Sequence, residues 1–319
     1  MSKIICGVDV CSVDLQARIG CDGPECCFPN TPEGIAGLAE FCRQQGVELV
    51  AMEATGGYEK QAFSQLWALG LAVAILNPRS VRRFAEGMGW LEKTDRIDAG
   101  VIAWFAQVKR SRPCTPASAQ QEHLQALVTR LRQLTELQTM QRNQRLLVTD
   151  PTVLASFTQV LALLASQIRA LATAISEQIA ADPLWQQLDQ AFRSIKGVAD
   201  RTVACLMAEM PEIGTLSNKA ISKLAGLAPL ARDSGTIHGK RAVRGGRAQV
   251  RAILFVVASV VRRHHPDFAA FDRRLRAAGK PKKVIRVALA HKLLVRLNAK
   301  ARQIRAQLRE TASGVLVHS

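Results

Sequence analysis

The chain has 319 residues, of which 48% are hydrophobic, so it can form two domains with ordered cores and is not a disordered protein. Its formal net charge is +17, and the excess is unevenly placed. Residues 183–319 hold 26 Lys and Arg against 8 Asp and Glu, whereas residues 1–115 and 116–182 are close to neutral. This asymmetry favours a polyanionic partner, nucleic acid before a membrane.

The sequence also bears on location. Met1 runs into an apolar strand without a signal-peptide pattern, and the strongly apolar run near residues 252–261 is far shorter than the ~20 residues that span a bilayer. The eight cysteines lack the paired spacing of a zinc site, which favours reduced thiols. We therefore expect a cytoplasmic protein.

The first 110 residues alternate between strand and helix patterns. Three strand patterns come first, and helix, strand, helix, strand and helix patterns follow. This order is that of the ribonuclease-H-like α/β fold, in which the first and fourth strands lie side by side. The expected strands are Ile4–Val10, Leu15–Ile19, Glu25–Phe28, Glu48–Ala54 and Leu71–Leu76, and the expected helices are Pro32–Gln45, Tyr58–Leu69, Arg79–Glu86 and Thr94–Gln107.

Four acidic residues stand at informative places in this pattern. Asp9 and Glu53 each end an apolar run, where a carboxylate is costly unless it is paired or binds a metal. Asp95 and Asp98 are three apart, so they share one face of a helix. Two strand-end acids and two helix acids are a suitable donor set for two Mg²⁺ ions, which take oxygen ligands and assist phosphoryl transfer.

Residues 116–181 carry a long helical pattern. Apolar residues from Leu154 to Ile175 recur at alternating steps of three and four, and the earlier half shows the same spacing. This pattern is typical of a coiled-coil seam, with a tip at Thr149-Asp150-Pro151. By periodicity alone, an intramolecular helical hairpin and a dimerisation surface are both open.

The basic last segment, mainly α-helical in pattern, contains two candidate DNA-binding features. Residues 194–204 resemble half of a helix-hairpin-helix element, although plain packing around Gly197 is an alternative. Ser234 precedes a glycine in a basic loop that ends in Gly245-Gly246. Arginines bind phosphate oxygens, so Ser234 could attack a phosphodiester held by this loop. The candidate nucleic-acid-binding residues are Lys196, Lys240, Arg241, Arg244, Arg247 and Arg251.

Several strings together resemble one family, the transposases of the bacterial insertion sequence 110 family. The matching strings, in order, are Gly7-Val8-Asp9, Met52-Glu53-Ala54-Thr55-Gly56-Gly57-Tyr58, Asn77-Pro78, Lys93-Thr94-Asp95-Arg96-Ile97-Asp98-Ala99, Gly226-Leu227-Ala228-Pro229, and Ser234-Gly235 through Gly245-Gly246. The match spans nearly the whole chain.

The resemblance implies a RuvC-like DEDD domain at 1–112, a coiled-coil hairpin at 113–182 and a serine transposase domain at 183–319. Asp9, Glu53, Asp95 and Asp98 would bind Mg²⁺, and Ser234 would form a covalent link to DNA. The family's partners are target and donor DNA, a structured bridge RNA and further copies of the protein in a dimer of dimers. In that assembly the coiled coil makes protomer contacts, and the DEDD domain of one protomer meets the serine domain of another.

Two rival functions remain at this stage. A Holliday-junction resolvase or another ribonuclease-H-like nuclease would hydrolyse DNA with metal-activated water and would not need the serine. A non-catalytic nucleic-acid-binding protein would need neither group, but the presence of all four acids argues against it.

Overall fold

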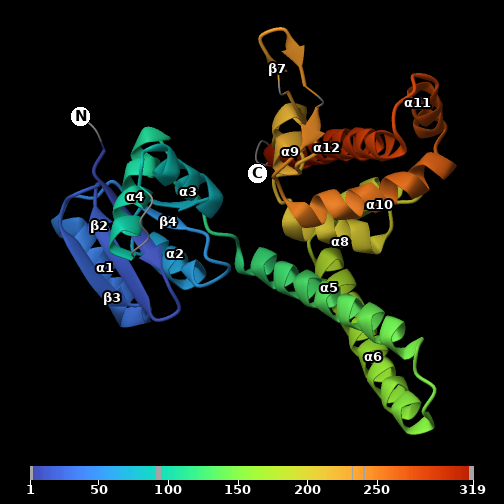
Figure 1. The fold of residues 1–319 in the computed structure, drawn as a ribbon, viewed down its shortest axis with the longest axis horizontal. Coiled ribbons are helices and arrows are strands. Elements are labelled where there is room, and N and C mark those ends of the chain that lie inside the picture. The colour runs from blue at the N-terminus through green and yellow to red at the C-terminus, as the bar shows by residue number, and fades with distance from the viewer. Residues whose placement is uncertain (1–2, 91–94, 232, 240, 316–319) are drawn as a thin grey trace. The chain divides into compact units, whose positions relative to one another are not determined.

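The structure is a computed structural model that describes residues 3–90, 95–231, 233–239 and 241–315. The chain divides into two compact units, Met1–Ala117 and Ser118–Ser319, which are described separately here (Figure 1).

The first unit is built on a five-stranded mixed sheet with the order β3-β2-β1-β4-β5. β1 pairs antiparallel with β2 and parallel with β4, which confirms that the first and fourth strands are neighbours. This is the strand arrangement expected of a ribonuclease-H-like sheet. The strands are β1 (Ile5–Val10), β2 (Asp14–Ile19), β3 (Glu25–Pro29), β4 (Leu49–Glu53) and β5 (Val73–Leu76), and the helices are α1 (Pro32–Gln44), α2 (Glu59–Ala68), α3 (Pro78–Gly87) and α4 (Asp95–Val108).

The two faces of the sheet are covered by different helices, because successive strand residues point to opposite sides. Cys6, Val8 and Met52 pack with residues of α1 and α2, whereas Ile5 and Ala51 pack with residues of α3 and α4. Both faces are buried, so the central strands β1 and β4 are apolar up to Asp9 and Glu53 near their ends, as parallel strands between two helical layers must be.

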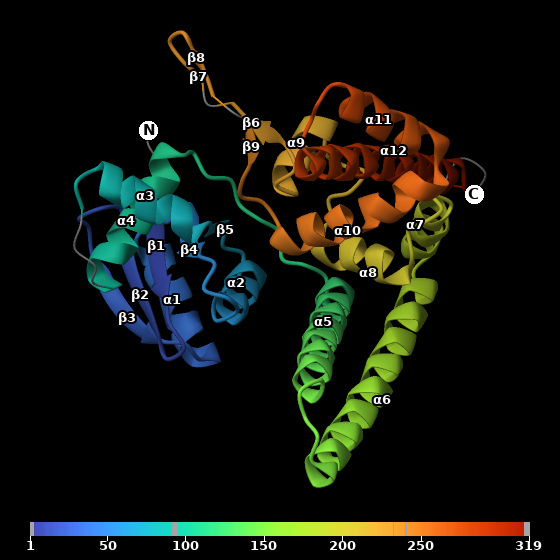
Figure 2. The ribbon, with the colours of Figure 1, turned by 45° about the vertical axis from the view of Figure 1, so that its right-hand side comes forward.

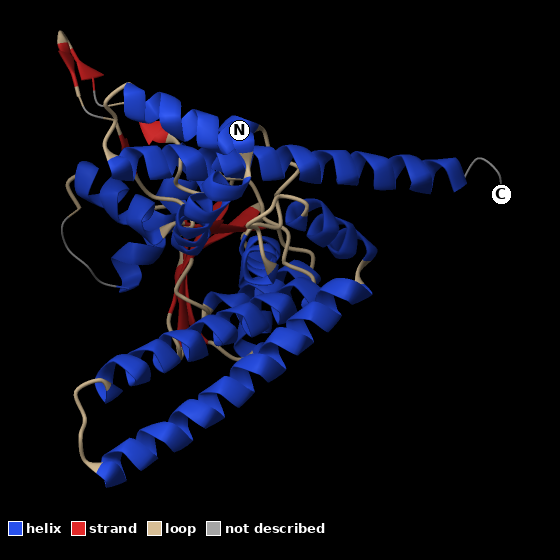
Figure 3. Cartoon of the chain, turned by 90° about the vertical axis from the view of Figure 1, so that its right-hand side faces the viewer, coloured by secondary structure: helices blue, strands red, loops and turns tan. Residues whose placement is uncertain are grey.

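The second unit begins with two long helices, α5 (Ala119–Arg145) and α6 (Pro151–Ala181), which pack against each other and are joined by a short connection (Figure 3). Asp150 caps α6, since one of its carboxylate oxygens accepts from the backbone N–H groups of Thr152 and Val153. Pro151 occupies the first turn, where its missing N–H costs nothing. The connection between α5 and α6 therefore lies in residues 146–150, directly before Pro151.

Six further helices and a small ribbon complete the second unit. Its core joins Phe192, Phe268 and Leu297 to Leu124 and Ile175 from the near end of the hairpin, so the hairpin and the C-terminal helices share one core. The helices are α7 (Pro183–Arg193), α8 (Asp200–Glu209), α9 (Asn218–Leu224), α10 (Ala248–His264), α11 (Pro266–Ala277) and α12 (Lys282–Val315). The ribbon strands are β6 (Pro229–Leu230), β7 (Asp233–Ser234), β8 (Ile237–His238) and β9 (Ala242–Val243).

The helix α10 is exposed on one side, although its central part is apolar nearly all round. The apolar run from Ile253 to Val261 suggests a helix buried on all sides, but Val256 is 57% exposed and Val260 is 38% exposed. The core of the unit lies against one face of α10, through Leu254, Val257 and Val261, and the opposite face is left open. An all-apolar helix can therefore still have an exposed side when only one layer of helices packs on it.

Candidate active site

Asp9 and Glu53 lie beside each other at the ends of neighbouring parallel strands. The register pairs Val8 with Met52, so the next residues along the two strands are Asp9 and Glu53. Both carboxylates are half-buried. By strand alternation they share the sheet face with Gly7 and Ala51, which is the face covered by α4.

A close backbone contact brings α4 onto this pair. A Cβ placed on Gly7 would lie 2.0 Å from the carbonyl oxygen of Ala99 and 2.6 Å from the backbone nitrogen of Ala103. Only glycine allows such an approach of helix to strand. Asp98 is half-buried and directly precedes Ala99, so it lies one residue from this contact with β1.

The structure thus sets Asp9 and Glu53 side by side at one end of the sheet, and it places Asp98 in the first turn of α4, the helix that packs on β1. Asp95 is the first residue of α4, and its side chain lies outside the described residues. Each of the three described acids already has a polar partner. Within the described part of the chain, no group of three or more His, Cys, Asp or Glu is close enough to hold a metal ion. The donors suit Mg²⁺ in kind, because all are carboxylate oxygens.

Sequence reasoning missed Glu59, which holds the loop after Glu53. Its Oε2 atom accepts from the backbone N–H groups of Thr55 (3.1 Å) and Gly57 (2.8 Å) and from the Thr55 hydroxyl (2.9 Å). Burial raises the pKa of Glu59, but these hydrogen bonds outweigh it and leave the pKa below its ordinary value. The sequence pattern that could have identified this role is a carboxylate in the first turn of a helix that follows a glycine-rich loop.

Ser234 lies in a short hairpin in the second unit. β7 pairs with β8, and Ser234 is opposite Ile237. Gly235 takes a φ of +54° in the two-residue turn between them, as tight hairpin turns require. Ser234 is exposed, and the hairpin projects from the helical body of its unit (Figure 2). The side chain of His238, four residues further along, lies outside the described residues, as does Lys240.

The base of the ribbon is fixed by closely packed glycines. A Cβ on Gly246 would lie 2.2 Å from the backbone nitrogen of Gly226, and one on Gly226 would lie 2.1 Å from the carbonyl oxygen of Gly245. All three glycines have positive φ. β6 and β9 pair just beyond this crossing, which holds the two ends of the ribbon together.

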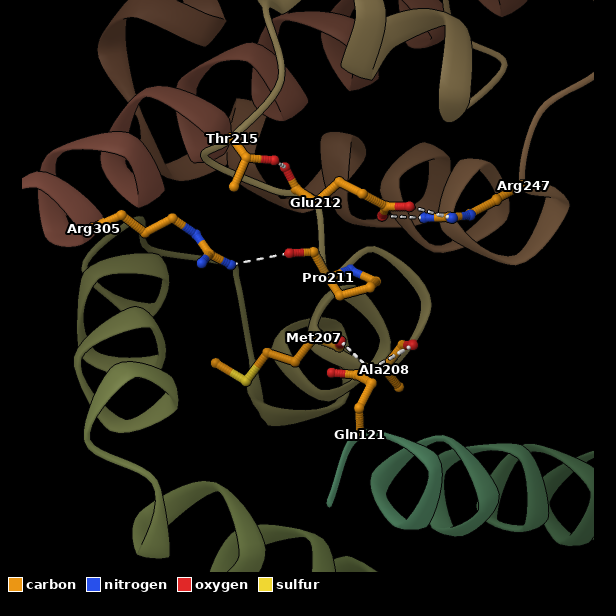
Figure 4. Close-up of polar contacts among 8 residues, drawn as sticks. All are labelled: Gln121, Met207, Ala208, Pro211, Glu212, Thr215, Arg247 and Arg305. Carbon is orange, nitrogen blue, oxygen red and sulfur yellow. Dashed lines mark hydrogen bonds and ion pairs between the residues drawn. The ribbon is translucent and has the colours of Figure 1, made fainter. Parts of the chain in front are cut away.

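An ion pair braces the same base. Arg247 donates from both terminal nitrogens to Glu212, at 2.5 and 2.6 Å, in a two-pronged arrangement (Figure 4). Burial raises the pKa of Glu212, but the hydrogen bond from Arg247 and the positive charge of Arg247 outweigh it and lower the pKa overall. Arg247 therefore has a structural role here, and its predicted contact with phosphate would have to displace Glu212.

The loop that carries Glu212 is itself held by α12. Arg305 donates to the carbonyl oxygen of Pro211 at 2.9 Å (Figure 4). It also donates to the carbonyl oxygen of Ile213 at 2.9 Å, and Asn298 accepts from the backbone N–H of Gly214 at 2.8 Å. A chain of contacts thus runs from α12 through this loop to the ribbon that presents Ser234.

The remaining predicted nucleic-acid contacts differ in their surroundings. Lys196 and Arg244 are exposed. Arg241 forms an ion pair with Asp233 at 3.2 Å, and Arg251 donates to the carbonyl oxygen of Gly245. Gly197 packs against Val261 of α10, which accounts for the glycine by packing. Binding of nucleic acid by these residues stays a prediction.

We expect Gly7→Ala to destabilise the first unit, because its methyl group meets backbone atoms of α4 that cannot move independently. The free energy of unfolding should fall by about 2 kcal/mol or more. Urea denaturation of the full chain, followed by tryptophan fluorescence, measures this, since Trp67, Trp90 and Trp104 lie in the first unit. The control is Gly87→Ala at the end of α3, where a Cβ has nothing within 4 Å. Equal stability of the two variants would contradict the contact.

The Glu212–Arg247 pair predicts a pH-dependent loss of stability. The folded-state pKa of Glu212 is lowered from 4.5, so its contribution is full above pH 4.5 and is lost as pH falls through the folded pKa. Glu212→Gln should therefore lower Tm at neutral pH, and the difference from the unaltered protein should shrink on acidification. Melting curves from pH 7 to pH 3 test this. Glu177→Gln, an exposed change on α6, should give no such trend.

Comparisons with known proteins agree on one family. Residues 8–148 match a DEDD transposase model of the IS110 family, described as "Transposase", and residues 189–273 match the model "Transposase IS116/IS110/IS902 family". The two matches together cover more than two thirds of the chain.

Individual relatives point the same way. The chain is 28% identical to a "Pilin gene-inverting protein" of Moraxella bovis, over 96% of this chain and 98% of the relative, and equally to that of Moraxella lacunata. It is 33% identical to an uncharacterized 43.6 kDa protein of insertion element IS110 from Streptomyces coelicolor, over 41% of this chain and 31% of the relative.

One solved structure, titled "Thermus thermophilus RuvC structure", matches 35% of this chain and 99% of its own at 15% identity, but its TM-score of 0.26 is too low to carry an argument. The sequence matches carry the assignment: the chain has both transposase domains of the IS110 family, and it is a DNA-processing enzyme of that family.

Proposed function

We propose that this transposase cuts and rejoins DNA through Ser234, with Asp9, Glu53, Asp95 and Asp98 holding Mg²⁺ at the scissile phosphate. The observation that carries the proposal is the presentation of Ser234: it is exposed on a projecting hairpin, and the base of that hairpin is fixed by crossed glycines and by the Glu212–Arg247 pair. A nucleophile that must reach a separately bound phosphate needs both reach and a rigid support.

The chemical step is a transesterification. The Ser234 oxygen attacks the phosphorus, its proton leaves, and a serine–phosphate ester forms while the bond to one sugar oxygen breaks. That oxygen leaves as a hydroxyl after it takes up a proton. The reverse reaction with a new strand end restores the phosphodiester without any external energy source, because one phosphate ester is exchanged for another.

The carboxylates would support this step through bound Mg²⁺, which stabilises the negative charge that develops on the transferring phosphate. The chain's own contribution is to place the donors. Parallel pairing sets Asp9 beside Glu53, and the contact at Gly7 fixes α4, the helix that carries Asp98, against β1. Glu59 holds the loop after Glu53 through three hydrogen bonds.

Rejoining distinguishes this proposal from the nuclease alternative. The Moraxella relatives are named as proteins that invert a pilin gene, and inversion requires every cut end to be joined again. A covalent protein–DNA intermediate conserves the ester needed for that joining. A RuvC-like resolvase or nuclease that uses metal-activated water would release free ends.

The basic C-terminal segment supports a further part of the proposal, guidance by a structured bridge RNA that pairs with target and donor DNA. Aromatic residues make up only 5% of the chain, which provides few stacking platforms for reading bases. Sequence recognition by base pairing, with the protein holding phosphates through residues such as Lys196 and Arg244, fits this composition.

Ser234→Ala should abolish covalent protein–DNA adducts and recombination, because no other group replaces the hydroxyl in forming the ester. The adducts are measured by denaturing electrophoresis of labelled DNA after incubation with the protein, Mg²⁺ and the RNA encoded beside the gene. Thr236→Ala, two residues away in the same hairpin turn, is the matched control and should retain adducts.

The nuclease alternative gives a different pattern in the same assay. Cleavage that persists in Ser234→Ala, without any adduct in the unaltered protein, would favour hydrolysis and contradict the proposal. Asp9→Asn and chelation of Mg²⁺ by EDTA should each stop cleavage in either case, since both chemistries use the carboxylate site.

We also propose that the division at 1–112, 113–182 and 183–319 is functional, and that the hairpin joins protomers into a dimer of dimers. The seam residues Leu154, Leu161 and Ile168 remain half-buried against α5, while Leu163 on another face is 62% exposed. Near the tip, Leu146 is 80% exposed and Leu147 is 91% exposed. Two helices alone leave this surface in water, and a second hairpin would cover it.

The exposed apolar surface of α6 has one alternative explanation, which is contact with a membrane. Among the described residues, α6 is the one helix that is long and apolar enough to cross a membrane by length and composition. It carries Gln159, Gln167 and Arg169 in its central part and packs along α5. A second hairpin therefore accounts for its apolar face with less cost than a bilayer would.

Leu163→Glu should weaken the assembly, because it places a charge in the apolar surface between hairpins. We expect a shift toward monomer in light scattering coupled to size-exclusion chromatography. Gln167→Glu adds the same charge to an exposed polar position of α6 and should leave the mass unchanged. An unaltered assembly in Leu163→Glu would place the protomer contact elsewhere.

A further inference from the structure

A large groove lies beside the base of the ribbon that carries Ser234. Its volume is about 1270 Å³, and it is lined by residues of β6, β9, α11 and α12. All of these elements belong to the second unit. Among the residues that line the groove, Arg241 is the one already proposed to contact nucleic acid.

The floor of the groove is apolar. Leu227, Val243, Phe271, Val284 and Val287 contribute to it, and Val284 is 50% exposed. Such a surface offers no partner for a phosphate, but it can take up the flat face of a base or an apolar side chain. The half-exposed Val284 offers an open apolar surface to the flat face of a base, and the Phe271 ring adds aromatic surface beside it.

The rim of the groove is basic. Arg241, Arg274, Lys283 and Lys292 line it, against a single carboxylate, Asp267. That carboxylate is already paired with Arg296 at 3.2 Å. Arg274 lies 5.1 Å and Lys292 lies 4.8 Å from the centre of the Phe271 ring, so the cations border the apolar floor directly. Apolar surface edged by cations complements a chain of bases with phosphates at its side.

Other occupants fit less well. The exposed hairpin tip of a second copy is apolar, but Arg142 and Arg145 on it would be repelled by the rim. A duplex keeps its bases stacked inside, so it would touch the rim and leave the floor empty. His291 lies in the groove, where burial lowers the pKa of its imidazole. The neutral ring has one donor and one acceptor for the edge of a base.

We propose that this groove binds an unpaired DNA strand beside the point of cleavage, with bases on the apolar floor and phosphates on the basic rim. The inference rests on the proposed function for its ligand, DNA, but not on the chemistry of Ser234. Strand exchange must produce unpaired nucleotides near the cut. β9 lines the groove and belongs to the ribbon that presents Ser234, so a strand leaving the hairpin would meet this surface.

Binding of two oligomers with equal charge tests the base-binding role. The full-length Ser234→Ala protein is titrated with a fluorescent 12-mer of thymidine and with a 12-mer of abasic sugar phosphates. We expect the thymidine oligomer to bind at least about five-fold more tightly, because stacking of a base is worth about 1–3 kcal/mol. Equal affinities would overturn the proposal, as would tighter binding of a uridine 12-mer, which would make the ligand RNA.

Substitutions test whether the preference for the thymidine oligomer arises in the groove. Val284→Trp fills the floor and should remove most of the preference for thymidine, while Lys283→Glu should weaken both oligomers alike. The matched controls are Val256→Trp, on the exposed face of α10 and outside the groove, and Lys300→Glu, farther along α12. If Val256→Trp removes the preference as Val284→Trp does, or if neither variant changes it, the groove is not the site.

The outcome is separable from that of the proposed function. Covalent adducts that depend on Ser234, together with equal binding of both oligomers, would support Ser234 as the nucleophile and contradict base binding in the groove. A thymidine preference that depends on Val284, in a protein that never forms adducts, would support base binding in the groove and contradict the role of Ser234 as the nucleophile.

Discussion

The backbone contact between α4 and β1 at Gly7 is the constraint on which the carboxylate site depends. A helix normally stands off a strand by the thickness of its side chains, but here a Cβ on Gly7 would lie 2.0 Å from the Ala99 carbonyl oxygen. The helix is therefore fixed in height and in rotation above the strand. Asp98 precedes Ala99 and Asp9 follows Gly7 by two residues, so one contact relates acids that are far apart in sequence.

In the second unit, the same kind of close backbone contact supports Ser234, the proposed nucleophile. Gly226 and Gly246 cross at a distance that only glycines allow, and Arg247 is held by Glu212, whose loop is held by α12. Rigidity thus lies at the base of the ribbon, while its tip projects with an exposed serine. This arrangement suits a group that must act on a phosphate bound elsewhere, on the same protomer or on a neighbour.

The surfaces of the second unit divide into two chemical kinds. The far part of the hairpin exposes leucine and methionine, such as Met140 at 45% and Leu147 at 91%, and it is suited to another copy of itself. The groove beside the ribbon combines an apolar floor with Arg274 and Lys283 at its rim, and it is suited to unpaired nucleic acid. Assembly and substrate contact can therefore be altered independently by substitution.

The sequence by itself determined the strands and helices of the first unit, the pairing of its first and fourth strands and the residue types of the candidate site, because apolar periodicity and strand-end carboxylates are local patterns. Tertiary structure decided which groups support them. The sequence predicts that Arg247 binds phosphate, but in the structure Arg247 forms an ion pair with Glu212, 35 residues away. The apolar run around Val256 predicts a buried side chain, but no layer of helices covers Val256. Glu59 as a loop clamp and the groove at Phe271 were also decided there, because hydrogen-bond partners and cavities depend on distances between elements that no local pattern encodes.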